Sequence, residues 1–467
     1  MVSGPSLTPR LLVEAQRAEQ AAAAAGLTFN EVVFEMLDAA DVNAVAAYGG
    51  FPTRYASWRF GMEYERLAKG YSWGLSKIYE LVVNHDPTIA YLVRSNSLME
   101  QKLVMAHVFG HADFFMNNAW FAPTERRMLE RFEEHARRIQ GHVDAHGQDR
   151  VERFLDVALG LEPLMDPFGP QRRHRAAQRR AAEGRGAAVS SRAERSRTSL
   201  RLVMGEADAA AAPPTPRLPT FDLFTFLMEQ AELEDWERDV LWIVRAEAEY
   251  FLPQRLTKII NEGWATFWHS RLLTGGLLDG AELVDFADCH SAATQAGAGQ
   301  LNPYKLGLDL FRHAARQGRD LFRLRAVHND VSFVDEVMDE EFVARSSLFV
   351  SQRGRRGGGQ RIGSRDHAEV KRELLRSLAW GGQPRIRLEE VAAGGSRALV
   401  LRHLHDGRDL KLDEAASVLR TLEGLWRAPV QLLTEEDGEP RRLTADGGEV
   451  TVRDDSAGGP PSAVRAG

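Results

Sequence analysis

The sequence predicts a mainly α-helical body followed by a small C-terminal domain of α/β or α+β type. Three observations support this prediction. Long segments repeat apolar residues every three or four positions, which is typical of amphipathic helices. An Arg-, Ala- and Pro-rich segment interrupts them, and beyond Gly354 short strand-like runs alternate with helical ones. A chain of 467 residues with 44% hydrophobic content has room for two or three domains.

The N-terminal part of the body, residues 1–165, is expected to be helical. Helical spacing covers residues 7–25, and Gly26 gives a stop signal. Leu27–Ala47 also has amphipathic spacing and is predicted to form a second helix. A dense series of aromatic residues follows between positions 51 and 79. Because each ring buries a large apolar area, we expect this series to lie in the core.

Residues 166–219 are predicted to be a disordered insertion. Between Gln171 and Ser199 there are nine Arg against two Glu and almost no large apolar residue. Ala209–Pro219 adds an Ala/Pro tract. Such a composition buries too little apolar surface to fold alone. The body must therefore close around this insertion rather than end there.

Helical periodicity returns in residues 220–350, where Pro253 separates two predicted helices. The small mixed domain is predicted to cover residues 351–440. Its expected elements, in chain order, are a helix at 366–379, strands at 385–390 and 397–403, a helix at 415–426 and a strand at 430–434. Residues 441–467 are predicted to form a disordered tail.

Two apolar helices carry polar residues where a core would prefer leucine. In Asn96–Asn118, His107 and His111 lie one turn apart and project from the same helix face. Thr257–Ser270 places Glu262 in a similar apolar setting. Burying such groups without partners costs several kcal/mol, so they must be paired, hydrated or bound to a metal. We therefore predict that the two histidines and the glutamate bind zinc or another divalent metal.

The arrangement is similar to that of gluzincin peptidases, which hold zinc with His-x-x-x-His and a Glu from an Asn-Glu-Gly-aromatic-Ala segment. Those enzymes place a Glu directly after the first His, where it accepts a proton from the metal-bound water. This chain has Val108 at that position. Glu100, Asp113 and His269 are the candidates to replace the missing catalytic base.

Two other interpretations of the polar residues remain open. Buried histidines often form hydrogen bonds within a core and bind no metal. A dinuclear carboxylate centre would also combine Glu and His on neighbouring helices, but such centres use Glu-x-x-His spacing, which neither stretch contains.

Several longer motifs resemble the SpoVR (stage V sporulation protein R) family. In chain order they are YELVVNHDPTIAYL, MAHVFGHADFFMNN, KIINEGWATFWHS, LNPYKLGLDLF and VHNDVSFVDEV. The resemblance runs from about Phe29 to about Leu433, outside the insertion. It implies a bacterial, cytoplasmic protein linked in sporulating species to spore cortex formation. The resemblance also implies two possible partners, a serine-kinase-like AAA+ protein and a von Willebrand A-type protein.

Composition excludes several classes of protein. A net charge of -7 argues against a general nucleic-acid binder. Cys289 is the single cysteine, so no disulfide can form within the chain and a reducing compartment is expected. No segment approaches the ~18 apolar residues of a membrane span. The first 26 residues carry acids within their apolar section, unlike a signal peptide. We expect a cytoplasmic protein.

Two functions fit these observations. The first is a zinc-dependent hydrolase-like protein that acts on a peptide or amide bond; the number of polar groups at one predicted centre favours it. The second is a non-enzymatic regulator or scaffold with a structural metal or buried polar centre, acting with the kinase-like partner. Val108 favours the second function, since it removes the usual base.

Overall fold

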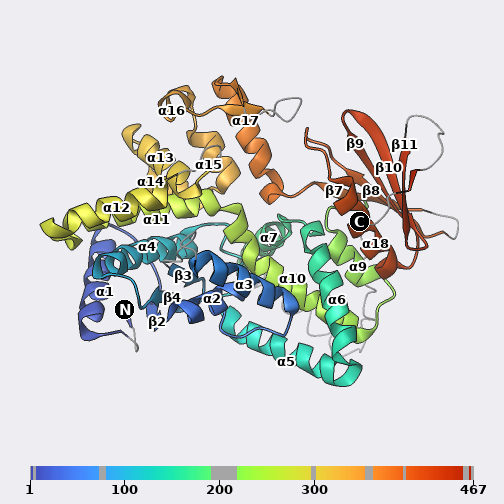
Figure 1. Cartoon of the computed structure of the whole chain (residues 1–467), viewed down its shortest axis with the longest axis horizontal. Coiled ribbons are helices and arrows are strands. Elements are labelled where there is room, and N and C mark those ends of the chain that lie inside the picture. The colour runs from blue at the N-terminus through green and yellow to red at the C-terminus, as the bar shows by residue number, and fades with distance from the viewer. Residues whose placement is uncertain are drawn as a thin grey trace. The chain divides into compact units, whose positions relative to one another are not determined.

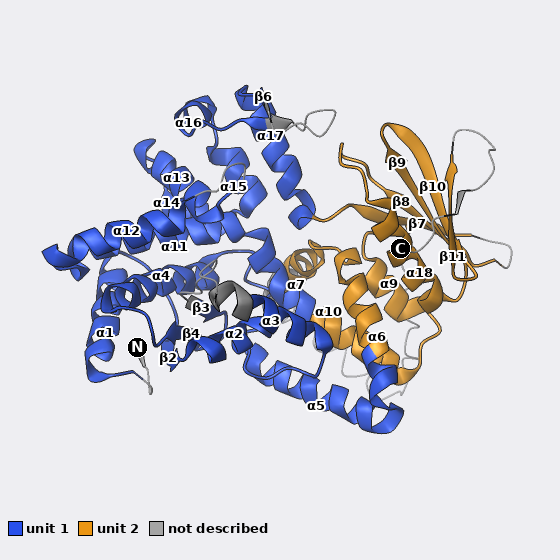
Figure 2. Ribbon diagram, viewed as in Figure 1, with its two compact units in different colours: residues 1–152, 247–382 blue, residues 153–246, 383–467 orange. Residues whose placement is uncertain are grey.

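The computed structural model describes residues 2–3, 7–72, 80–190, 218–295, 301–352, 361–392, 396–455 and 462–463. The chain forms two compact units, each built from separate chain segments (Figure 2). Unit 1 consists of Met1–Glu152 with Glu247–Gly382, and unit 2 of Arg153–Ala246 with Gln383–Gly467. The predicted fold class is confirmed, since a mainly helical body is accompanied by a small C-terminal domain with a mixed sheet.

Unit 1 contains a four-stranded sheet in the order β1-β2-β4-β3. The strands are β1 (Val2–Ser3), β2 (Val32–Leu37), β3 (Glu80–Val83) and β4 (Thr88–Val93). β2 runs parallel to β1 and β4, and β3 pairs antiparallel with β4. The helix predicted for Leu27–Ala47 is therefore wrong over β2, where buried and partly buried residues alternate as on a strand. Only α2 (Ala39–Ala47) is helical in that segment.

The helices of unit 1 enclose two hydrophobic clusters, a large one and a smaller one around Phe51 and Phe132. These helices are α1 (Pro9–Ala24), α2, α3 (Trp58–Ser72), α4 (Leu98–Asn117), α5 (Met128–His146), α11 (Lys258–Leu272), α12 (Leu283–Thr294), α13 (Pro303–Arg316), α14 (Leu321–Val327), α15 (Asp330–Val337), α16 (Glu340–Arg345) and α17 (His367–Leu378). A two-stranded ribbon joins β5 (Val350–Gln352) to β6 (Arg361–Ser364). Figure 1 shows α4 between the sheet and α11. This layering buries most of α4.

Side-chain caps fix the start of each of the two central helices. Ser97 caps α4 in a capping box with Glu100, in which each side chain accepts a hydrogen bond from the other residue's backbone N–H. The first N–H groups of α11 are capped by Asp330 of α15, whose carboxylate accepts from Ile259 N at 3.0 Å and Ile260 N at 2.9 Å. A carboxylate at a helix N-terminus also interacts favourably with the positive end of the helix dipole.

Glycines allow α4, α11 and α13 to approach closely. A Cβ atom on Gly110 of α4 would lie 2.6 Å from the Ala265 Cα of α11. Gly263 of α11 and Gly307 of α13 face each other, and a Cβ on either would lie under 3 Å from the other's backbone. These positions therefore require glycine for packing rather than for backbone conformation.

Unit 2 contains a six-stranded sheet in the order β12-β11-β10-β9-β8-β7. The strands are β7 (Ile386–Val391), β8 (Leu399–His403), β9 (Val430–Glu436), β10 (Glu439–Asp446), β11 (Glu449–Asp454) and β12 (Ser462–Ala463). α18 (Leu412–Trp426) connects the parallel strands β8 and β9. The unit also contains α7 (Gly169–Ser190) and α9 (Leu223–Gln230). Two further helices, α6 (Gln148–Leu161) and α10 (Asp235–Leu256), include the chain positions at which the units are divided.

Three predicted segment boundaries need correction. α7 occupies the start of the predicted disordered insertion 166–219, since Ala and Arg favour helix even without an apolar face. Residues 191–217 of that prediction lie outside the described residues. β10 and β11 occupy the first part of the predicted tail 441–467, joined by a glycine turn at Gly447 and Gly448 with φ of 62° and 82°. α17 belongs to unit 1, so the small domain begins later than residue 351.

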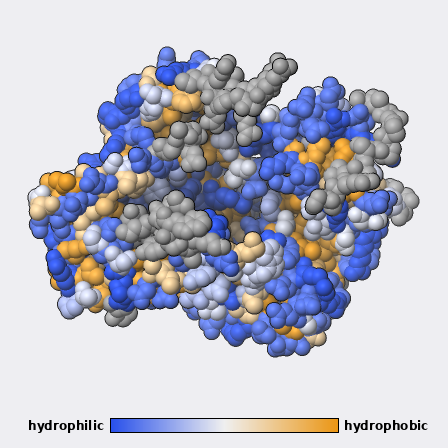
Figure 3. Space-filling view, in the orientation of Figure 1, coloured by the Kyte–Doolittle hydropathy of each residue, from blue (hydrophilic) through white to orange (hydrophobic). Residues whose placement is uncertain are grey.

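The visible surface carries mostly hydrophilic residues with separate apolar patches (Figure 3). Within the described residues, every helix is too short or too polar to span a bilayer.

Candidate metal centre

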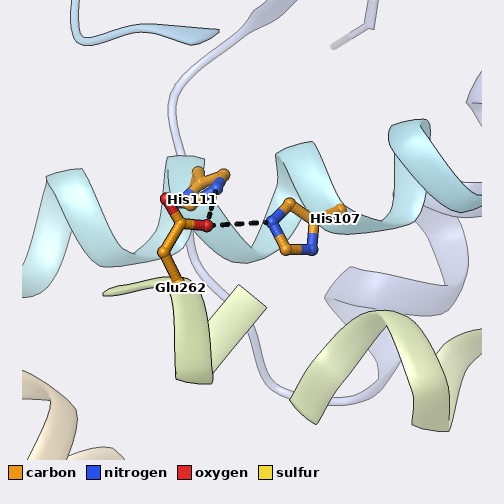
Figure 4. Close-up of side chains that lie close together, drawn as sticks. All are labelled: His107, His111 and Glu262. Atoms are coloured by element: carbon orange, nitrogen blue, oxygen red, sulfur yellow. Dashed lines mark ion pairs between the residues drawn. The ribbon is translucent and has the colours of Figure 1, made fainter. Parts of the chain in front are cut away.

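His107, His111 and Glu262 converge in the core of unit 1 (Figure 4). The two histidines point from α4 toward α11, and the glutamate points from α11 toward them. Glu262 Oε2 lies 3.5 Å from the Nε2 atom of each histidine. All three residues are buried, and their ligand atoms lie within 4.8 Å of one another. The structure therefore brings together the three residues predicted as metal ligands.

Neighbouring side chains orient two of these groups. His111 Nδ1 lies 3.0 Å from Asn261 Oδ1, which can only accept, so the hydrogen-bond network assigns the ring proton to Nδ1. Lys258 Nζ donates to Glu262 Oε1 at 2.5 Å. The remaining atoms, His111 Nε2 and Glu262 Oε2, then face each other across the centre.

The charge of Glu262 bears on what the centre can hold. Burial alone would raise the pKa of its carboxyl, but the Lys258 ammonium and the two imidazoles outweigh burial and hold this pKa well below its usual value. Glu262 is thus a carboxylate. Its Oε2 is buried and makes no hydrogen bond of ordinary geometry within the described structure. A cation beside this anion would be stabilising.

The geometry fits a metal. Ligands about 2.1 Å from a tetrahedral zinc lie about 3.4 Å from one another. The separations of 3.5 Å between Glu262 Oε2 and the Nε2 atoms of His107 and His111 match this spacing. The donor set of two imidazoles and one carboxylate is also one that zinc uses in catalytic sites.

A cavity of about 260 Å³ opens beside the centre. His111 and Glu262 contribute to its wall, and Glu262 is the one carboxylate among the described residues that line it. The polar part of the wall also includes Gln254, Lys258 and Tyr304. The rest of the wall is mainly apolar and includes Gly49, Phe51, Leu81, Val82, Val83 and Phe115. The cavity therefore joins a polar centre to an apolar surface in which part of a substrate can lie.

The three residues predicted as catalytic bases lie in different surroundings. His269 contacts the centre, since its Nδ1 lies 2.8 Å from His107 Nδ1. Burial and then the neighbouring imidazoles hold the pKa of His269 well below its usual value, so its ring is neutral. Glu100 accepts a hydrogen bond from Ser97 N at 2.6 Å in the cap of α4. It therefore stabilises the start of the helix, two turns from His107.

Asp113 is part of a separate buried network. Its carboxylate accepts from Thr28 N at 2.9 Å and from Trp264 Nε1 at 2.8 Å, and it pairs with Arg325 at 3.0 Å. Burial raises the pKa of Asp113 to about 6, although Arg325 opposes this effect. Asp113 thus ties α4 to α11 and α14 and does not line the cavity.

Sequence reasoning assigned no site role to Lys258 or Tyr304. The contact of Lys258 with Glu262 could have been predicted from helical spacing, because Lys258 lies one turn before Glu262 on α11. The Tyr304 ring lies stacked near His107, with centroids 6.0 Å apart. No local signal in the sequence reveals the contact between Tyr304 and His107, since it depends on how α13 and α4 both pack against α11.

A second polar cluster is buried elsewhere in unit 1. Glu247 pairs with Arg54 at 2.6 Å and with His135 at 3.0 Å, and the Arg54 guanidinium lies over the Phe132 ring at 4.3 Å. The positive charge of Arg54 balances the negative charge of Glu247, so this cluster is a buried ion pair rather than a metal site.

Fold and site together define a mainly helical protein whose body holds a buried group of two histidines and one carboxylate with metal-ligand spacing. The chain belongs to the SpoVR family. Residues 8–383 match the model of the SpoVR like protein, and residues 384–437 match that of the SpoVR-like C-terminal domain. The division between these models at residue 383 coincides with the start of the last segment of unit 2.

Among curated proteins, the chain is similar to the uncharacterized protein YcgB of Escherichia coli (strain K12). The two are 30% identical over 442 residues, which cover 83% of this chain and 85% of the relative. Comparison with solved structures gives no significant match.

Proposed function

We propose that this chain binds zinc through His107, His111 and Glu262 and acts as a metal-dependent hydrolase on a peptide or amide bond. One observation carries the proposal. The carboxylate oxygen of Glu262 lies 3.5 Å from both imidazoles, in a buried group that opens on a cavity. Structural zinc sites usually have four protein ligands, whereas catalytic sites have three and leave one position open. The group of three supports the catalytic type.

Each residue around the proposed zinc has a distinct task. A bound zinc supplies a Lewis acid and lowers the pKa of a bound water. Asn261 accepts the Nδ1 proton of His111 and so holds Nε2 as the ligand atom. Lys258 binds Oε1 of Glu262, which leaves Oε2 for the metal. Lys258 and Tyr304 line the cavity and are placed to donate hydrogen bonds to a substrate carbonyl.

Among the residues that the structure describes, the base that usually follows the first histidine has no direct substitute at the cavity. Val108 occupies its position, and Glu100 and Asp113 act elsewhere in the fold. His269 contacts the far nitrogen of His107 and is absent from the cavity wall. This observation favours a second candidate function, a regulator or scaffold with a structural metal that works with a kinase-like AAA+ partner and a von Willebrand A-type protein.

Metal content tests the proposal first. Protein purified without an affinity metal is measured by mass spectrometry as wild type and as the His107→Ala, His111→Ala variant. A matched control is His142→Ala, His146→Ala, which removes a pair with the same spacing from partly exposed positions on α5. We expect about one zinc per chain in the wild type and the control, and none in the first variant. An equal zinc content in all three proteins would refute these ligands.

A peptide hydrolysis assay then distinguishes the hydrolase from the regulator or scaffold. Zinc-loaded protein is incubated with a mixed peptide library, and new amino termini are measured. Cleavage by the wild type that is lost in Glu262→Gln supports the hydrolase. A zinc-loaded wild type that cleaves nothing, and that unfolds when a chelator removes the zinc, supports the structural metal instead.

A further inference from the structure

Three imidazoles lie in a line that leads away from the candidate metal centre. His107 Nδ1 lies 2.8 Å from His269 Nδ1, and His269 Nε2 lies 3.0 Å from His290 Nδ1. They come from three different helices, α4, α11 and α12. His107 and His269 are buried, whereas His290 is partly exposed. Both short contacts are hydrogen bonds between ring nitrogens.

The protons of such a chain are ordered by the chemistry of imidazole. A neutral ring has one N–H donor and one lone-pair acceptor, so each ring can donate to one neighbour only. When all three rings are neutral, fixing the proton on one ring fixes the proton on the other two.

Only two orders satisfy both hydrogen bonds. In the outward order His107 Nδ1 donates to His269 Nδ1, and His269 Nε2 donates to His290 Nδ1. His107 Nε2 then carries a lone pair and can bind a metal. In the inward order every donor is reversed, and His107 Nε2 carries a proton that faces Glu262. A proton at that nitrogen prevents metal binding.

We infer that His290 is a positioning residue for the metal centre, although it lies two rings away from the metal ligand. By accepting the His269 Nε2–H at its Nδ1, it stabilises the outward order and so keeps a lone pair on His107 Nε2 with which to bind the metal. His290 also stacks near Phe286, with centroids 5.4 Å apart, which holds its ring orientation. This inference rests on the proposed zinc site and adds α12 to its supporting elements.

Zinc affinity of the full-length chain tests the inference, measured by competition with a chelator. His290→Leu removes the acceptor and should weaken zinc binding by about tenfold, the lower range for outer partners of metal ligands. His290→Asn keeps an acceptor oxygen near the position of Nδ1 and should restore most of that loss. Ser291→Leu adds the same side chain at the next, exposed position of α12 and should leave the affinity unchanged.

A second comparison distinguishes proton order from a general structural effect. In His269→Asn the amide oxygen can still accept from His107 Nδ1, but the link to His290 is cut. Adding His290→Leu to this variant should then cause no further loss. Nitrogen NMR of histidine-labelled protein should report an Nδ1–H on His107 in the wild type and in His290→Asn. In His290→Leu it should report a mixture of the two ring forms.

The outcomes separate the inference from the proposed function. A folded wild type that binds no zinc refutes the zinc site and with it this inference. A wild type that binds zinc, together with a folded His290→Leu of equal affinity and an unchanged His107 signal, overturns the inference alone. Equal losses from His290→Leu in the wild type and in the His269→Asn background would also overturn it, because the effect would not pass through His269.

Discussion

Replacing Gly110 with alanine tests whether the contact between α4 and α11 positions the candidate metal centre. Gly110 lies on α4 between the two histidines, and α11 carries Glu262. The added Cβ would lie 2.6 Å from Ala265 Cα and 3.1 Å from Ala265 Cβ. Non-bonded carbon atoms prefer about 3.5–4.0 Å. The two helices must therefore separate by about 1 Å to accept one methyl group.

The expected loss of stability follows from two opposing terms. Overpacking a core costs about 1–3 kcal/mol, and the upper value applies because one colliding atom belongs to the backbone and cannot change rotamer. Alanine gains about 1 kcal/mol over glycine within a helix. Gly110→Ala should thus lower the free energy of unfolding by about 2 kcal/mol. The same shift exceeds the ~0.5 Å tolerance of a preorganised site, so zinc content should also fall.

Urea unfolding followed by circular dichroism measures the first effect, and mass spectrometry of the folded protein measures the second. Gly141→Ala is the matched control, because Gly141 lies within α5 at an exposed position with no heavy atom within 4 Å of the added Cβ. The control should gain about 1 kcal/mol and keep its zinc. If both variants become more stable to a similar extent, the close contact between the helices is wrong.

Three other perturbations have defined outcomes. Chelating the proposed zinc should lower the free energy of unfolding by about 2.7 kcal/mol when free zinc is 100 times its Kd, and equal unfolding curves would argue against a bound metal. Burial raises the pKa of Asp330 to about 7. Protonation of its carboxyl therefore stabilises the folded state, and this stabilisation is full below about pH 4 and is lost as the pH rises through 7. Asp330→Asn should remove this slope in unfolding measured from pH 5 to 8, and an unchanged slope contradicts the assignment. Arg54→Met leaves Glu247 buried without its ion pair and should cost about 3 kcal/mol, most of which the added Glu247→Leu should recover. A double variant no more stable than the single one would refute this pairing.

The sequence predicted the helices of the body better than its sheet. α4 and α11 have apolar spacing over many turns, which is a strong helical signal. β2 is short and follows a helix, and six residues give too little periodicity to distinguish a strand from a turn of helix. β10 and β11 did have a usable signal, since the pair Gly447-Gly448 separates two alternating runs.

The site was predictable where it depends on spacing along one helix. His107 and His111 follow from the helical repeat, and Glu262 follows from its unusual place in an apolar segment. The contacts across helices could not be predicted. The chain His107–His269–His290 and the distant positions of Glu100 and Asp113 depend on how α4, α11 and α12 turn toward one another, and that is fixed by packing at glycines and by the Asp330 cap.

Unit 1 consists of two separate chain segments, and this affects how it folds during synthesis. His107 and its contact His269 are separated by 162 positions along the chain. At about 5–20 residues per second, a ribosome needs about 8–30 s to pass from the first to the second. During that time α4, which is mostly buried in the folded protein, has no α11 to pack against. Newly made chains should therefore depend on chaperones that cover this helix until synthesis reaches the second half of the body.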